Sequence, residues 1–152
     1  MLARAADNLY WIARYMERAE NMARMLDVSW RMSLLPMGDD PQRLQWEPAL
    51  IVAGCDERFA ARGGAINARN VIEFLALDPA NPSSIHSCLR SARENARAMR
   101  TQLTTEVWET LNATWLEAHR YDWERLNQVG FRAYFDWVME RSHLFRGVRT
   151  SR

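Results

Sequence analysis

Residues 13–26 read ARYMERAENMARML, and this stretch decides the fold. From Leu2 to about Met32, apolar residues recur every three or four positions, in one series spaced by seven and in a second that fills the alternate steps (Leu2, Leu9, Met16, Ala23, Trp30; Ala5, Ile12, Ala19, Leu26). This spacing predicts one long helix, about residues 2–33, with a seam like that of a coiled coil. Pro36 and Gly38 are expected to end it.

A second run with helical spacing follows the sequence LDPANPSS. Its apolar residues share one face, which predicts a helix over about residues 84–111 (Ile85, Leu89, Ala92, Ala96, Met99, Leu103, Val107). Ser83 or Ser84 is placed to cap it, because a hydroxyl accepts hydrogen bonds from free backbone N–H groups. Two or three shorter helices are expected elsewhere, and no segment alternates as a strand does. The expected fold is all-α, an antiparallel helical bundle with no sheet.

The composition narrows the class of protein. A chain of 152 residues that is 48% hydrophobic suits one domain, residues 1–152, with a sizeable core. All 20 basic residues are arginine, but the net charge is only +1, which argues against a nucleic-acid binder. No apolar run approaches the length of a membrane span. Cys55 and Cys88 have neither metal-ligand spacing nor the look of a disulfide framework, so we expect a soluble, cytoplasmic protein.

Polar side chains follow one edge of the first predicted helix, beside its apolar seam (Tyr10, Arg14, Glu17, Asn21, Arg24). Glu20 borders this edge four residues before Arg24, in the favourable order for an ion pair, and Arg18 points away from it. A salt-bridged flank, in which arginine stems cover the rim of the core, would produce this pattern. The alternative is a half-buried ionic network that binds a ligand or a partner carboxylate.

A second polar cluster lies in SARENARAMR, on the second predicted long helix. Arg90, Glu94 and Arg97 share the face opposite the apolar stripe, where solvated ion pairs are expected. Arg93 borders that stripe. Asn95 lies closer to the interior, where an amide needs partners. Asn21 is its expected partner, and such a contact would fix the register of the two long helices.

The first predicted helix also has a second apolar strip, formed by Trp11, Tyr15 and Met22. A helix that is apolar on two sides needs neighbours on both. The strip is therefore either buried in the centre of the bundle or covered by a partner or a second copy. We treat these three residues as the candidate interface.

Catalytic machinery is not evident. His86, His119 and His143 are scattered, without the spacing of metal ligands. Gly63-Gly64 is followed by AINA, which does not fit a phosphate-binding loop. We therefore assign no catalytic residue, metal or cofactor.

Two long stretches carry a resemblance to a known family. They are MLARAADNLYWIARYMERAENMARMLDV at the start and NPSSIHSCLRSARENARAMRTQLTTEVWETLN in the middle, and FLALDPANPSSI and SHLFRGV agree as well. The sequence resembles the alpha-E domain proteins, a bacterial family of predicted helical domains with a conserved Glu-Arg motif. The resemblance places that motif on Glu17 and Arg18 and a second conserved stretch on Arg93, Glu94, Asn95 and Arg97. Members are usually about twice as long, so the resemblance implies that the chain corresponds to their N-terminal half, as a truncated copy or a fragment.

The resemblance also implies a class of neighbouring or fused proteins. Alpha-E proteins are encoded beside, or fused to, ATP-grasp-type and transglutaminase-like proteins, which implies a part in amide-bond or peptide-modifying chemistry. Our leading hypothesis is a non-catalytic helical module that docks through apolar helix faces onto an ATP-grasp-type ligase, or onto another copy of itself. Arginine and glutamate rows would orient it. The alternative is an enzyme or substrate-binding subunit whose Glu/Arg clusters bind a carboxylate.

Overall fold

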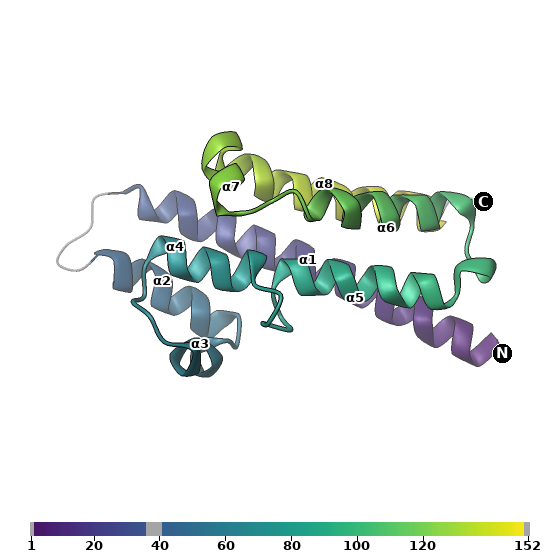
Figure 1. Ribbon diagram of the computed structural model, residues 1–152, viewed down its shortest axis with the longest axis horizontal. Helices are drawn as coiled ribbons and strands as arrows, with labels where there is room; N and C mark the ends of the chain where they lie inside the picture. The colour runs from purple at the N-terminus through teal and green to yellow at the C-terminus, as the bar shows by residue number, and fades with distance from the viewer. Residues whose placement is uncertain (1, 36–40, 151–152) are drawn as a thin grey trace.

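The computed structural model describes residues 2–35 and 41–150, and each regular element in these ranges is a helix (Figure 1). The elements, in chain order, are α1 (Leu2–Ser33), α2 (Pro41–Val52), α3 (Asp56–Arg62), α4 (Ala68–Ile72) with the π-helical turn Glu73–Leu77, α5 (Ile85–Ala98), the 3-10 turn Arg100–Gln102, α6 (Thr105–Ala118), α7 (Trp123–Val129) and α8 (Phe131–Thr150). The expected all-α bundle without a sheet is confirmed for the described residues.

Four helices form the bundle. α1 packs against α5 and α8, and α6 packs against the same two helices. Each of the four runs antiparallel to the neighbours it contacts, and both chain ends lie at one end of the bundle (Figure 1). The shorter helices gather at the other end, where α2 packs on α1, and α3 and α4 pack on α2.

The first predicted long helix is confirmed as α1, over Leu2–Ser33. Five residues of the predicted seam are buried, with at most 3% of each exposed (Ile12, Met16, Ala19, Ala23, Leu26), and Leu9 and Trp30 of the same seam are partly buried. This seam faces α5 and α8. Pro36 and Gly38 lie outside the described residues.

The predicted helix over 84–111 is wrong in its extent. α5 ends at Ala98, a 3-10 turn covers Arg100–Gln102, and α6 begins at Thr105 and runs back along α5. The Thr104 side chain accepts a hydrogen bond from the Val107 N–H at 3.2 Å and so caps the new helix. The apolar stripe continues through the reversal because both arms of the hairpin pack on one core, and the spacing therefore does not reveal the break.

The expected cap on α5 is confirmed at Ser84. Its hydroxyl accepts from the Ser87 N–H at 3.1 Å and donates to the Asp78 carbonyl at 2.8 Å. Asn81 is buried beside it, donates to the Phe74 carbonyl at 2.9 Å and accepts from the Ser83 N–H at 3.1 Å. These bonds fix the loop that precedes α5, and with it the position of Ser83.

Candidate functional site

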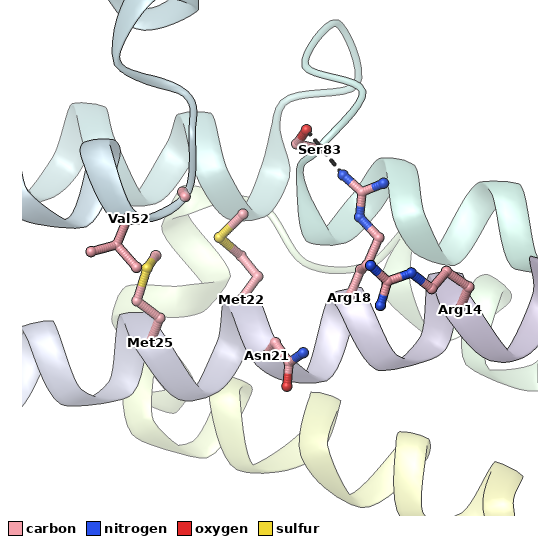
Figure 2. Close-up of a pocket in the computed structure, with 8 residues that line it drawn as sticks. Arg14, Arg18, Asn21, Met22, Met25, Val52 and Ser83 are labelled. Atoms are coloured by element: carbon pink, nitrogen blue, oxygen red, sulfur yellow. Dashed lines mark hydrogen bonds between the residues drawn. The ribbon is translucent and has the colours of Figure 1, made fainter.

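A pocket of about 240 Å³ opens on the outer face of α1 (Figure 2). Its lining comes from the middle of α1, from the end of α2 with the residue after it, and from the loop before α5 (Arg14, Arg18, Asn21, Met22, Met25, Val52, Ala53, Ser83). Four of these residues, Arg14, Arg18, Asn21 and Met22, belong to the predicted polar motif and the predicted interface. The structure thus brings part of both groups to one place.

One side of the pocket is cationic. Arg18 donates to the Ser83 hydroxyl at 3.5 Å, and Figure 2 shows its side chain reaching toward that residue with the Arg14 side chain beside it. Arg58 of α3 donates to the same hydroxyl oxygen at 3.2 Å. Arg14 pairs with Glu17 at 3.8 Å, a long and solvent-exposed ion pair. Among the described residues that line the pocket there is no carboxylate.

The other side of the pocket is apolar. The Met22 and Met25 side chains point toward the end of α2, where Val52 lies (Figure 2). Both methionines are half-buried, but Val52 remains 76% exposed. The pocket therefore joins two guanidinium groups to an open apolar wall.

The predicted interface residues Trp11 and Tyr15 lie on the same face of α1, toward its N-terminus. Together with Arg18, Met22 and Met25, they recur at steps of three and four residues, which places all five on one face of α1. We call this face the strip. Trp11 is 41% exposed, and its ring touches those of Tyr10 and Tyr15 with centroids 5.3 and 6.0 Å apart. Within the described part of the chain, this aromatic group is only partly covered.

Glu20 lies in a separate network that joins α1 to α8. It is buried, and its carboxylate accepts hydrogen bonds from Arg24 at 2.6 Å and from the Ser142 hydroxyl at 2.7 Å. Arg146 lies 3.0 Å from the same carboxylate, and His143 lies 3.7 Å away. The predicted Glu20–Arg24 pair is confirmed.

The charge on Glu20 is stabilised by these partners. Burial acts to raise the pKa of Glu20, but the hydrogen bonds from Arg24 and Ser142 and the charge of Arg146 outweigh it, and the pKa lies below its ordinary value of 4.5. Glu20 is therefore an ionised structural group, and it does not line the pocket described above.

The second predicted cluster lies apart from the pocket, on α5. Glu94 pairs with Arg93 at 2.9 Å and with Arg97 at 3.9 Å. Asn95 donates to the Ser91 carbonyl of its own helix at 2.8 Å. Asn21 is exposed and accepts from Arg24 at 3.4 Å, so the expected contact between the two asparagines is not formed. An α-helical carbonyl one turn back satisfies the Asn95 amide without a second helix.

Sequence reasoning missed the residues that complete each group. The sequence indicates Ser83 only as a candidate helix cap, and no spacing connects Arg58 with α1. Ser142, His143 and Arg146 reach Glu20 from more than 120 positions away. The signal that could have found Ser142 and Arg146 is their spacing of four on α8, which presents both to one neighbouring helix.

The described residues that line the pocket include no histidine, carboxylate, cysteine, lysine or tyrosine. Both hydrogen-bond partners of the Ser83 hydroxyl in the described structure are arginine donors, which cannot take its proton. No three His, Cys, Asp or Glu side chains of the described residues are grouped so that they could hold a metal ion. Within the same residues, no helix combines the length and apolar character needed to cross a membrane.

The fold and the pocket define an all-helical domain, a four-helix antiparallel bundle with a cationic and apolar pocket on its first helix. The chain belongs to the Alpha-E family, described as a predicted alpha-helical domain with a conserved ER motif, and the match covers residues 1–152. The resemblance assigns the motif to Glu17 and Arg18. In the structure Glu17 pairs with Arg14, and Arg18 lines the pocket.

The chain is also similar to large mycobacterial proteins. It is 32% identical over 121 residues to an uncharacterized protein of Mycobacterium bovis, over 71% of this chain and 14% of that protein. Uncharacterized proteins of two Mycobacterium tuberculosis strains match over the same shares, at 32% and 31% identity. The chain thus spans 14% of the length of these curated relatives. No solved structure matches it.

Proposed function

We propose that this chain is a non-catalytic docking module of a cytoplasmic, ATP-grasp-type amide or peptide ligase system. Its uncovered α1 face would bind the ligase, a transglutaminase-like protein of the same system, or a second copy of the chain. The resemblance to alpha-E proteins supports the choice of system. The pocket, with arginine donors around its serine, supports a binding role over a catalytic one.

The exposed part of the α1 face carries this proposal. Trp11 is 41% exposed at one end of that face, and Val52 of α2 is 76% exposed in the pocket at the other. Aromatic and aliphatic side chains gathered on one surface mark sites of protein association more often than scattered single residues do. Large aromatic residues also supply much of the binding energy at protein interfaces.

The arginines on the same face would set the orientation of the complex. Arg14 and Arg18 lie between the aromatic end of the strip and the methionines. Guanidinium groups bind carboxylates through two parallel hydrogen bonds, which fixes direction as well as distance. A partner surface with acidic residues opposite these arginines, and an apolar patch beside them, would match the strip.

Co-purification with an ATP-grasp-type protein of an alpha-E system tests the proposal. We expect Trp11→Asp to reduce the recovered complex at least tenfold, because a carboxylate would enter an apolar contact. Leu116→Asp is the matched control, since Leu116 is 59% exposed on α6 and lies outside the strip. Circular dichroism should show equal helix content in both variants. Undiminished recovery of the Trp11→Asp complex would remove the strip from the interface.

Light scattering of the chain alone distinguishes a second copy of the chain from a different protein as the partner. A mass of two chains that falls to one chain in Trp11→Asp would identify a second copy as the occupant.

The enzymatic alternative requires the Glu17/Arg18 and Glu94/Arg97 clusters to face one cavity. The described geometry favours it less, because the lining of the α1 pocket includes no residue of α5.

A further inference from the structure

The α1 pocket has a composition that a partner surface does not by itself require. It is concave, it holds about 240 Å³, and its cationic and apolar halves are separate. We infer that this pocket binds a free carboxylate carried on a short apolar group, such as the C-terminal residue of a peptide. The inference goes beyond the docking proposal, because it concerns a small ligand that the isolated chain should bind.

Part of the cationic half lacks a matching anion among the described residues. Arg18 forms no ion pair with any residue that the structure describes, and its recorded hydrogen bond goes to the neutral Ser83 hydroxyl at 3.5 Å. Arg58 approaches the same oxygen at 3.2 Å. A hydroxyl oxygen offers two lone pairs but no charge, so two guanidinium groups converge on it without neutralisation. A carboxylate near Ser83 would supply the missing charge and accept from both arginines.

Arg14 can join such a site at little cost. Its ion pair with Glu17 is 3.8 Å long, and both side chains are about half exposed. Pairs of this kind contribute little to stability in water. A ligand carboxylate held by Arg18 would therefore compete well with Glu17 for the Arg14 guanidinium.

The apolar half selects what the carboxylate is attached to. Met22, Met25 and Val52 line it, and methionine side chains adapt to ligands of different shape. The volume is below the roughly 300–1,000 Å³ of pockets that hold drug-sized molecules. It suits one or two amino-acid residues with an aliphatic side chain. Inorganic phosphate would satisfy the arginines but leave the methionine wall in water.

Titration of the isolated chain with N-acetyl-leucine, followed by NMR or calorimetry, tests the inference. A probe of this size should bind with a dissociation constant of the order of millimolar. N-acetyl-leucinamide, which has the same shape but no charge, and acetate, which has no side chain, should each bind at least tenfold more weakly. If the amide binds as tightly as N-acetyl-leucine, the pocket does not recognise the carboxylate. If acetate or inorganic phosphate binds as tightly, the apolar half does not contribute to binding.

Two substitutions locate the ligand. Arg18→Gln should weaken N-acetyl-leucine binding at least tenfold without changing the thermal midpoint of unfolding, because Arg18 is exposed. Arg97→Gln removes a comparably exposed arginine from α5 and should leave binding unchanged. Undiminished binding by Arg18→Gln would refute the site. Trp11→Asp should retain N-acetyl-leucine binding, so that loss of partner docking and loss of this ligand are separate results.

Discussion

The two glutamates of ARYMERAENMARML show how much burial decides for a single residue. Glu17 and Glu20 lie one turn apart on α1 and look alike in the sequence. Glu17 is exposed, with one long ion pair, whereas Glu20 is buried against α8. Helical spacing correctly paired Glu20 with Arg24. It could not show that α8 returns to this point, because nothing in the local pattern of α1 depends on residues 142–146.

We predict that Glu20→Gln destabilises the fold by about 1–3 kcal/mol at pH 7, because Arg24 and Arg146 lose the charge that they share and hydrogen bonds to charged groups are the stronger kind. The free energy of unfolding in urea measures the loss. Glu17→Gln is the matched control and should change stability by less than about 0.5 kcal/mol, since its ion pair is exposed. Equal effects of the two substitutions would contradict the role assigned to the network.

The same variant should change the response to acid. The pKa of Glu20 in the folded state lies below its ordinary value of 4.5, so the unfolded chain binds this proton more readily. The stabilisation is therefore complete above pH 4.5 and is lost as the pH falls through the folded-state pKa. The difference in unfolding free energy between the native chain and Glu20→Gln should shrink over that interval and stay constant above it.

At the level of elements, the sequence predicted helices well and their ends less well. α1 matches its predicted range, because charged and apolar residues keep one period over its whole length. The predicted helix over 84–111 is two helices, α5 and α6, in the structure. The apolar stripe did not reveal the break, because both arms of the α5–α6 hairpin turn their apolar residues toward the same core. The cap at Thr104 was the available sign of a new start, with Glu106 favourably placed in the first turn of α6.

We predict that Thr104→Ala destabilises the fold by about 1 kcal/mol, because the Val107 N–H loses its hydrogen-bond acceptor. For a domain of this size the thermal midpoint should fall by roughly 2–4 °C. Thr105→Ala is the control, since Thr105 is exposed in the first turn of α6 and alanine is the better helix former. A larger loss from Thr105→Ala than from Thr104→Ala would show that the helix starts elsewhere.

At the scale of the whole molecule, α1 is the helix that joins the bundle to α2. It contacts α5 and α8 along its seam, and α2 packs against it near its C-terminal half. The all-α class and the bundle followed from periodicity, but the assembly of the pocket did not. Ser83 comes to the pocket from the loop before α5, and Val52 comes from the end of α2. Their positions beside α1 depend on how the helices pack, which the pattern of a single segment does not show.

This arrangement predicts an uneven resistance to local opening. The buried seam from Ile12 to Leu26 can be exposed only by separating α1 from α5 and α8, so its amide hydrogens should exchange only through global unfolding. In α3, over Asp56–Arg62, Phe59 is the buried side chain, and the helix has seven residues. Its amides should exchange through local opening with a much smaller free energy.

Hydrogen exchange measured by mass spectrometry distinguishes the two segments. Addition of urea should accelerate exchange in α1 far more than in α3, because global unfolding exposes more surface than local opening does. If α1 exchanged as fast as α3 in the absence of denaturant, α1 would not be the centre of the folded molecule, and the pocket on its outer face would lack the rigid support that binding requires.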